Sequence, residues 1–310
     1  MKVVFFGTPE YAVPALQAII DSKHDVVAVV SQPDKPKGRS NKLVPTPVKS
    51  KALEHGIRVF QFNKIRKDDI SELLAIPADV YVTCAYGQIL DERVLSATKN
   101  GVINLHGSIL PKYRGASPVQ SALLGLEKET GVSVLRSGIG LDDGNVMMIK
   151  KIPIAEDDNA ITLFDKLSLL SAEIIVPALD SIENGTAEFL PQDERMATKC
   201  SMLTPEMGEL DFTKSPEVVV GVIKGLAQWP NARITIDDVY FKLYNAVVSH
   251  VSVDNYKYGQ VVVANNKQGL HIKCGEGAIE VTELLPINSK KMSAKSYLNG
   301  KQIKIGSFAK

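Results

Sequence analysis

The sequence of 310 residues contains only three cysteines, Cys84, Cys200 and Cys274, which lie far apart along the chain. An odd number of cysteines with no CxxC pair argues against a disulfide framework and against a zinc site. No stretch approaches the roughly 18 apolar residues that a membrane-spanning helix needs. The apolar run Val3–Phe6 is too short for the core of a signal peptide. These absences predict a cytoplasmic protein with buried, reduced thiols and no membrane anchor.

The charges also lack a dominant sign, because 36 Lys and Arg face 35 Asp and Glu, which leaves a net charge of +1. This balance excludes a histone-like tail and an acidic disordered chain. The charges are nevertheless unevenly placed, since Ser31–Lys51 has six basic residues and one acid, and Tyr240–Lys310 has ten lysines and four acids. A solvated surface is one interpretation of each segment. Two such regions on a nearly neutral chain favour an extended polyanion, such as RNA, as the partner.

Short apolar segments alternate with helical patterns in the first part of the chain. The predicted strands are Lys2–Phe6, Asp25–Val30, Ile57–Phe60, Asp79–Cys84 and Gly101–Leu105, and the predicted helices are Pro9–Asp21 and Pro47–His55. The proline-rich segment Ser31–Pro47 is predicted to be a loop. This alternation is typical of parallel βαβ units and predicts an α/β, doubly wound, Rossmann-like domain. Ligands bind such sheets at the carboxyl ends of the strands, where Gly7, Tyr86-Gly87 and His106 would share one cleft.

The pattern changes in the second part of the chain. Strands are predicted at Val132–Leu135 and Val146–Ile154, and one long helix at Ala160–Asn184. Leu190–Glu209 shows little periodicity. The helix Ser215–Leu226 is followed by five short predicted strands: Ala232–Ile236, Val239–Tyr244, Gln260–Ala264, Gly269–Lys273 and Ala278–Leu284. Five short strands predict a small OB-like β-barrel. We therefore expect a catalytic domain over 1–189, a linker over 190–207 and an OB-like domain over 208–310.

One group of polar residues at a predicted strand end can carry chemistry. Asn104 and His106 are separated by one residue, so both side chains leave the strand on the same face. A carboxamide donor beside an imidazole can stabilise an oxyanion and move a proton. A core histidine beside a turn asparagine is the alternative interpretation. Asp142 or Asp143 could orient His106, although Asp-Gly is also a common turn sequence.

The segment Phe6–Glu10, Phe-Gly-Thr-Pro-Glu, lacks both the glycines of a dinucleotide-binding fingerprint and the lysine of a P-loop.

Several longer motifs resemble those of one family across nearly the whole chain. They are, in order, FFGTPEYAVPAL, SQPDKPKGRSNKL followed by PVK, CAYGQIL, INLHGSILPKYRGASPVQ, TGVSV, GLDDGNV and GLAQWPNA. On these motifs the chain resembles the methionyl-tRNA formyltransferase family. The chain departs from the family's usual pattern at Ser40, Ile109, Asp143 and Asn145, and at Ala197–Cys200.

The resemblance implies a role for three sets of residues. The implied catalytic residues are Asn104, His106 and Asp142. The implied folate-binding residues are Tyr86, Gly87, Leu90, Ser108, Ile109, Leu110 and Pro111. The implied tRNA-binding residues are Lys35, Lys37, Arg39 and Lys42.

The activity implied by the resemblance is transfer of the formyl group of 10-formyltetrahydrofolate to the α-amine of methionyl-initiator tRNA, which gives N-formylmethionyl-tRNA for translation initiation. The amine would attack the formyl carbon, and Asn104 and His106 would donate hydrogen bonds to the oxyanion that forms. Asp142 would orient His106. No metal is expected, because the donor is already an activated amide, and the chain is expected to act as a monomer.

Three rival functions remain open on the sequence. A sugar-nucleotide formyltransferase shares the segment HGSILPKYRG but does not need the basic loop QPDKPKGRSNKL. A glycinamide ribonucleotide formyltransferase resembles only the first part of the chain. A noncatalytic RNA-binding module would explain the basic tail but would leave Asn104, His106 and Asp142 without a role.

Overall fold

The computed structural model describes residues 1–37 and 42–310 and divides them into two compact units. The first unit comprises Met1–Pro118, Thr130–Ile152 and Phe164–Cys200, and the second comprises Val119–Glu129, Pro153–Leu163 and Ser201–Lys310. The expected domain bounds, 1–189, 190–207 and 208–310, stay a prediction.

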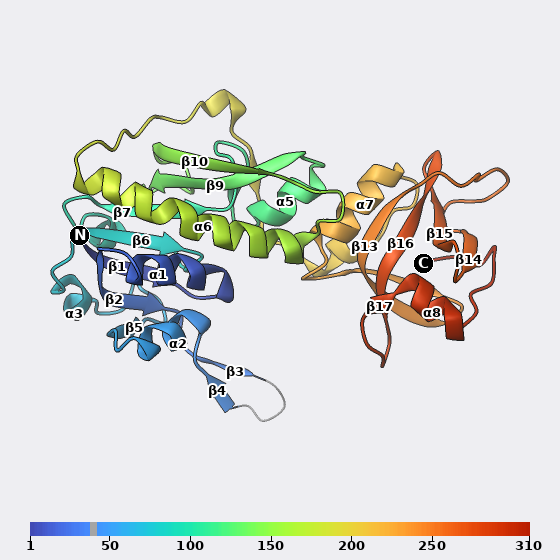
Figure 1. The fold of residues 1–310 in the computed structure, drawn as a ribbon, viewed down its shortest axis with the longest axis horizontal. Helices are drawn as coiled ribbons and strands as arrows, with labels where there is room; N and C mark the ends of the chain where they lie inside the picture. The colour runs from blue at the N-terminus through green and yellow to red at the C-terminus, as the bar shows by residue number, and fades with distance from the viewer. Residues whose placement is uncertain (38–41) are drawn as a thin grey trace. The chain divides into compact units, whose positions relative to one another are not determined.

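A seven-stranded sheet forms the centre of the first unit (Figure 1). Its strands are β1 (Lys2–Gly7), β2 (Asp25–Ser31), β5 (Val59–Gln61), β6 (Val80–Cys84), β7 (Val102–His106), β9 (Glu129–Arg136) and β10 (Val146–Pro153). Their order is β10-β9-β7-β6-β1-β2-β5. The five strands from β5 to β7 pair in parallel, which confirms the predicted Rossmann-like α/β unit. β9 runs antiparallel to β7, so the sheet is mixed rather than wholly parallel.

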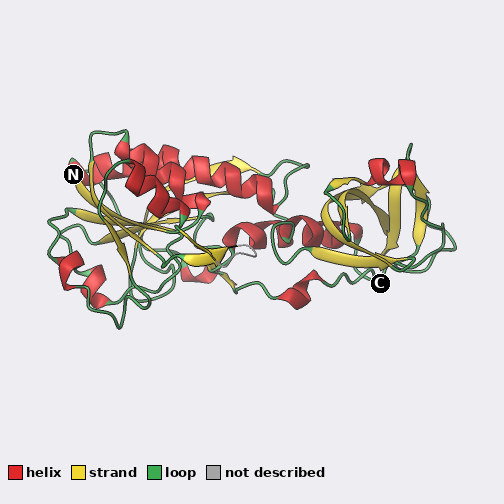
Figure 2. Ribbon diagram, turned by 90° about the horizontal axis from the view of Figure 1, so that it is seen from below, coloured by secondary structure: helices red, strands yellow, loops and turns green. Residues whose placement is uncertain are grey.

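Helices cover both faces of this sheet, as Figure 2 shows. They are α1 (Val13–Ile20), α2 (Pro47–Glu54), α3 (Ser71–Leu74), α4 (Glu92–Leu95) and most of α6 (Ala160–Glu183). α5 (Pro118–Leu124) begins at the boundary between the units. On β1, Val4 and Phe6 pack with Leu73 of α3 and Val94 of α4, and the alternate residue Phe5 is also fully buried. A strand that is buried on both faces must be apolar throughout, which is why β1 was visible in the sequence.

The predicted helix Pro9–Asp21 is confirmed: it begins as a 3-10 turn, η1 (Glu10–Ala12), and continues as α1, and Pro14 lies in the first turn of α1, where its missing N–H costs nothing. One local prediction in this unit was wrong. The predicted loop Ser31–Pro47 contains β3 (Lys35–Lys37) paired antiparallel with β4 (Lys42–Val44). A two-stranded ribbon has two open edges, so it tolerates Pro36, which lacks an N–H.

The segment after α6 also contains regular structure. It comprises η2 (Glu194–Met196), β11 (Lys199–Cys200) and η3 (Pro205–Gly208). β11 pairs in parallel with β8 (Arg114–Gly115), a short strand that follows β7. Residues 190–200 are therefore an integral part of the first unit.

The second unit contains a six-stranded antiparallel sheet. Its strands are β12 (Ala232–Ile236), β13 (Val239–Ser249), β14 (Val261–Asn265), β15 (Gly269–Cys274), β16 (Gly277–Pro286) and β17 (Met292–Ser293). The order is β12-β13-β16-β15-β14, and β17 pairs with β16. The core lies between this sheet and helices α7 (Pro216–Gly225) and α8 (Ala294–Gly300), where Ile223, Phe241 and Tyr297 meet.

The last residues of the chain hydrogen-bond to both edge strands of this sheet. Thr235 of β12 exchanges two backbone hydrogen bonds with Lys310, at 2.7 and 3.0 Å, and the Val261 N–H of β14 donates to the Ser307 carbonyl at 2.8 Å. The two edges that the strand order leaves open are therefore paired with the chain terminus.

Across residues 1–37 and 42–310, no helix has both the length and the apolar character that crossing a membrane requires.

Candidate functional site

The carboxyl ends of β6 and β7 hold the first part of the site. Thr83 of β6 is the parallel register partner of Asn104 of β7. The Thr83 hydroxyl donates to Asn104 Oδ1 at 2.8 Å. Asn104 Nδ2 donates to Asp142 Oδ1 at 3.3 Å, and because a carboxylate only accepts, this contact fixes which end of the amide is the donor.

His106 is the last residue of β7 and is 5% exposed. Its Nε2 lies 2.9 Å from the Tyr113 carbonyl oxygen, which can only accept, so Nε2 carries a hydrogen. The other ring nitrogen, Nδ1, lies 3.6 Å from Asp142 Oδ2. The ring is thus held by a hydrogen bond at Nε2, and its Nδ1 lies within ion-pair distance of Asp142.

Asp142 lies in the loop between β9 and β10, in the left-handed backbone region at φ 52°. Its Oδ2 accepts the Gly115 N–H at 2.9 Å, while Oδ1 accepts from Asn104. The neighbouring Asp143 is exposed. The structure therefore brings Asn104, His106 and Asp142 together, with a backbone N–H as a further contact. Their catalytic roles stay a prediction.

Two glycines fix the path of the loops around these side chains. At Gly144 an added Cβ would lie 1.7 Å from the Arg136 carbonyl oxygen. At Gly115, where φ is +127°, it would lie 2.1 Å from the Cys200 carbonyl oxygen. A larger residue would push Gly144 away from Arg136, or Gly115 away from Cys200, and so displace the loops that carry Asp142 and its Gly115 partner.

The segment after His106 is folded back on itself. Ser108 is 1% exposed, and its hydroxyl donates to the Lys112 carbonyl at 2.6 Å. The Leu110 N–H donates to Ser133 Oγ at 3.1 Å, and Leu110 is also buried. Ile109 and Pro111 are half-buried. Folate contacts from this segment, which stay a prediction, would come from Ile109, Pro111 and the backbone.

The other implied folate segment, 86–90, has its tyrosine in the core. Tyr86 is 4% exposed, packs edge-on against Phe6 at 5.5 Å, and burial raises the pKa of its phenol. The Tyr86 carbonyl accepts from Thr8 Oγ1 at 2.8 Å. Gly87 has a φ of 87°, and Leu90 packs against the same apolar cluster as Tyr86. The predicted contact with folate would therefore use the turn's backbone rather than the tyrosine ring.

Three of the residues implied to bind tRNA, Lys35, Lys37 and Lys42, lie on the β3–β4 ribbon. Lys35 is exposed at the start of β3, and Lys37 and Lys42 are register partners in the ribbon. Arg39 and Ser40 lie outside the described residues.

Two other lysines of the same basic segment have partners within the unit. Lys49 Nζ lies 2.7 Å from Asp34 Oδ2, which lowers the pKa of that carboxyl, and Lys51 pairs with Glu54 at 2.6 Å. The positive charge that the segment can offer to a polyanion is therefore smaller than its composition indicates.

The first unit also contains a buried thiol and a cluster of one histidine and two carboxylates. Burial raises the pKa of the Cys84 thiol to about 12, so it is not a thiolate at neutral pH. Within the described part of the chain, one group of side chains has the composition of a metal site: His24, Asp180 and Glu183. Lys23 pairs with both of these carboxylates, at 3.0 and 2.8 Å, and already supplies a positive charge there.

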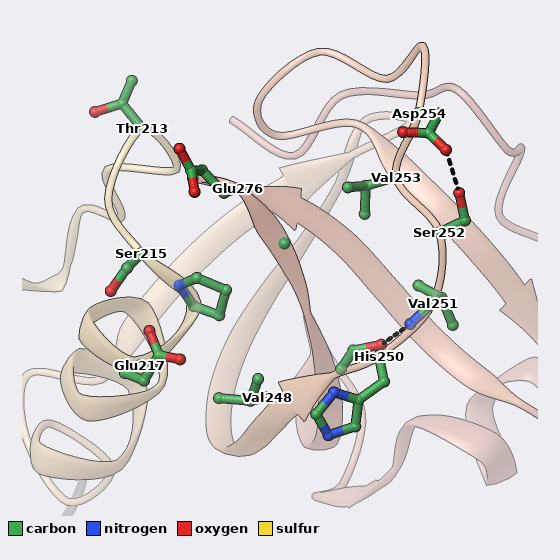
Figure 3. Close-up of a pocket in the computed structure, with 14 residues that line it drawn as sticks. Thr213, Ser215, Glu217, Val248, His250, Val251, Ser252, Val253, Asp254 and Glu276 are labelled. Atoms are coloured by element: carbon green, nitrogen blue, oxygen red, sulfur yellow. Dashed lines mark hydrogen bonds between the residues drawn. The ribbon is translucent and has the colours of Figure 1, made fainter.

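The second unit contains an open cavity of about 820 Å³ between the start of α7 and the loop 249–254 (Figure 3). Three carboxylates, Glu217, Asp254 and Glu276, line it together with His250. The negative charge of these carboxylates disfavours a phosphate backbone in this cavity.

Comparison with known proteins finds two formyl transferase domains in succession along the chain. The family described as formyl transferase matches residues 1–179, and the formyl transferase C-terminal domain matches residues 202–302. Proteins named methionyl-tRNA formyltransferase from Agathobacter rectalis and Lachnospira eligens are each 40% identical to this chain, over 99% of it and over 99% and 98% of their own lengths. The chain belongs to the methionyl-tRNA formyltransferase family.

A similar fold occurs in a solved sugar 3N-formyl transferase crystallised with dTDP and 5-N-formyl-THF. That structure covers 94% of this chain and 99% of its own at a TM-score of 0.70, with 20% sequence identity. The methionyl-tRNA formyltransferase family is thus supported by sequence over the whole chain, and the sugar enzyme shares the fold.

Three residues that touch the site were missed by sequence reasoning. Thr83 lies in a buried strand, Gly115 contributes only its N–H, and Gln192 donates to the Asp142 carbonyl from the segment without periodicity. None of them carries a local signal, because each acts through a contact with a residue at least 21 positions away.

The contacts of Asp142 predict that an asparagine cannot replace it. Both carboxylate oxygens face N–H donors, and an amide must turn an NH₂ group toward one of them. We expect Asp142→Asn to lower kcat for formyl transfer by about 10²- to 10⁴-fold. Asp143→Asn, in the exposed neighbour, should keep kcat within about twofold. Equal losses in the two variants, measured by steady-state kinetics, would contradict this assignment.

Loss of the Thr83 hydroxyl should lower kcat less than loss of the Asp142 carboxylate. Thr83→Val keeps the shape of the side chain but removes the donor that orients the Asn104 amide. Because one hydrogen bond contributes about 0.5–1.5 kcal/mol, kcat should fall about 2- to 12-fold. Thr83→Ser retains the hydroxyl and should restore kcat. Wild-type kcat in Thr83→Val would show that Asn104 is oriented without this contact.

Proposed function

We propose that this chain transfers the formyl group of 10-formyltetrahydrofolate to the α-amine of methionyl-initiator tRNA. The observation that carries the proposal is the contact network of Asn104, His106 and Asp142 at the carboxyl edge of the parallel sheet. The substrates are assigned from the family to which the whole chain belongs. The product is N-formylmethionyl-tRNA, which is used in translation initiation.

The side chains of Asn104 and His106 stabilise the oxyanion in this proposal. When the amine attacks the formyl carbon, negative charge develops on the formyl oxygen. The tetrahedral intermediate then collapses, the bond between the formyl carbon and N10 breaks, and tetrahydrofolate leaves with a proton on N10. Asn104 Nδ2 has two hydrogens and uses one toward Asp142, so the other is available to the oxyanion. A protonated His106 Nδ1 supplies a second donor on the same side. Preorganised donors of this kind contribute roughly 2.7–4 kcal/mol each to transition-state stabilisation.

Asp142 has two tasks in the same step. Its carboxylate lies 3.6 Å from His106 Nδ1 and stabilises the charged imidazole. The carboxylate also accepts the proton that the attacking amine loses, either directly or through water. The attack requires a neutral amine, so a carboxylate beside the reacting centre assists at both stages.

The folate cosubstrate is bound, in this proposal, by the segments 86–90 and 108–111, which flank Asn104, His106 and Asp142. These residues are Tyr86, Gly87, Leu90, Ser108, Ile109, Leu110 and Pro111. The hydroxyl of Ser108 already donates within its own segment, so Ile109, Pro111 and backbone groups make the contacts. The reaction needs no metal because the donor amide is already activated.

The tRNA is bound by basic residues of both units. On the first unit these are Lys35, Lys37, Arg39 and Lys42. On the second unit they are lysines of a sheet that we assign as an OB-like barrel, on the basis of its short antiparallel strands and the chain end that pairs with both edges. We further assign the enzyme to the cytoplasm, where it acts as a monomer.

The test of this function is a formylation assay with 10-formyltetrahydrofolate and methionine-charged initiator tRNA. Wild-type protein should form N-formylmethionyl-tRNA, and His106→Ala and Asn104→Ala should each lower kcat about 10²- to 10⁴-fold. Binding of tRNA should change little, because neither side chain is a phosphate contact. Formylation of an amino sugar nucleotide but not of charged tRNA would replace this function with the sugar alternative.

The proposed contact between Arg39 and tRNA predicts a salt-dependent KM for charged tRNA. Arg39→Ala removes a guanidinium that can bind phosphate bidentately, so the KM for charged tRNA should rise and its dependence on salt should weaken. Lys51→Ala is the matched control, because Lys51 already pairs with Glu54. KM for tRNA is measured across a salt series. An unchanged KM and slope in Arg39→Ala would remove this residue from the tRNA site.

A further inference from the structure

The segment from Phe189 to Cys200, here called the strap, contacts two segments beside Asn104, His106 and Asp142. These are residues 111–116 and the loop between β9 and β10, which carries Asp142. At one end, Val146 and Leu190 exchange two backbone hydrogen bonds, at 2.8 and 2.9 Å. At the other end, Thr198 accepts from the Arg114 N–H with its carbonyl at 2.9 Å and from the Tyr113 N–H with its hydroxyl at 2.8 Å. The strap thus ties the 111–116 segment to the loop that carries Asp142.

Gln192 lies in the middle of the strap and makes three hydrogen bonds with its side chain. Its Nε2 donates to two backbone carbonyls of the loop between β9 and β10, that of Asp142 at 2.8 Å and that of Gly144 at 2.7 Å. Its Oε1 accepts from Arg114 Nε at 3.0 Å. Both ends of the amide are therefore occupied, and the side chain spans from one loop to the other.

Arg114 holds Gln192 in this orientation. It is 4% exposed, and its two terminal nitrogens pair with the two oxygens of Glu194 at 3.0 and 2.8 Å. In sequence it lies between Tyr113, whose carbonyl contacts His106, and Gly115, whose N–H contacts the Asp142 carboxylate. The contacts close a ring that runs from the Asp142 carboxylate through Gly115, Arg114 and Gln192 to the Asp142 carbonyl.

We propose that Gln192 is a positioning residue for formyl transfer, which acts by fixing the backbone of Asp142. This inference rests on the proposed function. Asp142 has a φ of 52°, a conformation that a non-glycine residue keeps only where its surroundings impose it. The two carbonyl contacts of Gln192 on either side of Asp143 impose it, and they aim both carboxylate oxygens at Asn104 and His106. Gln192 itself touches neither of those side chains in the described hydrogen-bond network.

Two variants separate the contacts of Gln192. Gln192→Glu keeps an acceptor for Arg114 but places oxygens opposite the Asp142 and Gly144 carbonyls, so it breaks the loop contacts alone. Gln192→Met removes all three hydrogen bonds at similar length. Gln17→Met is the matched control, because Gln17 makes one hydrogen bond to Asp21 on α1 of the same unit. We expect kcat to fall about tenfold in both Gln192 variants, with KM for both substrates within about twofold, and no change in the control.

A double-variant cycle distinguishes positioning from general destabilisation. If Gln192 acts through Asp142, adding Gln192→Glu to Asp142→Asn should cause no further loss of kcat. Losses that multiply in the double variant, or a lower thermal midpoint with an unchanged kcat per folded molecule, would overturn the proposal.

Hydrogen exchange provides a readout that does not depend on formylation. Backbone amides of the 138–146 loop should exchange faster in Gln192→Glu than in wild type, and those of the control should not. If wild type formylates charged tRNA but Gln192→Glu changes neither kcat nor exchange, the positioning role is refuted alone. If the loop loosens but wild type formylates no charged tRNA, the proposed function fails, and with it any role of Gln192 in that reaction.

Discussion

The site depends on one carboxylate, that of Asp142, which faces N–H groups from two other segments of the chain. One oxygen accepts from the Asn104 amide, and the other accepts the Gly115 N–H and lies 3.6 Å from His106 Nδ1. A carboxylate is the one common side chain that accepts on both oxygens and carries negative charge. It can therefore orient an amide and an imidazole together, and charge-assisted contacts of this kind are stronger than neutral ones.

The fold provides a reason for each of these positions. Parallel pairing of β6 with β7 brings Thr83 beside Asn104, and the period of two along β7 turns His106 to the same side. Glycines at 115 and 144 allow the two loops to approach within van der Waals distance of neighbouring backbone. Ordering two loops costs conformational entropy, and the strap offsets part of this cost with hydrogen bonds that reach both.

Some of this could be predicted from the sequence and some could not. The strands β1 and β6 are buried on both faces, so their apolar runs were visible, and the spacing of Asn104 and His106 gave their shared face. The residues alone could not choose between Asp142 and Asp143, because both occupy a turn sequence. The choice depends on which carboxylate meets Gly115, a contact across 27 positions.

Three features had no local signal. The direction of β9 depends on its pairing with β7, which the composition of β9 does not encode. The β3–β4 ribbon contains Pro36, which argues against a strand unless that strand has an open edge. Gln192 reaches Asp142 from a segment without periodicity, since an isolated side chain that bonds to distant carbonyls leaves no repeating pattern. The resemblance to the family supplied the substrates, which neither periodicity nor charge could have named.

The Asp142 carboxylate accepts a hydrogen bond from the Gly115 amide, and NMR can test this contact directly. Arg114-Gly115 is the one Arg-Gly pair in the sequence, so labelling arginine carbonyls with carbon-13 and glycine amides with nitrogen-15 isolates a single signal. A hydrogen bond to a charged acceptor moves an amide proton to low field. The Gly115 amide proton should lie at low field in wild type and in Asp143→Asn and move to higher field in Asp142→Asn. The same position in all three proteins would contradict the account.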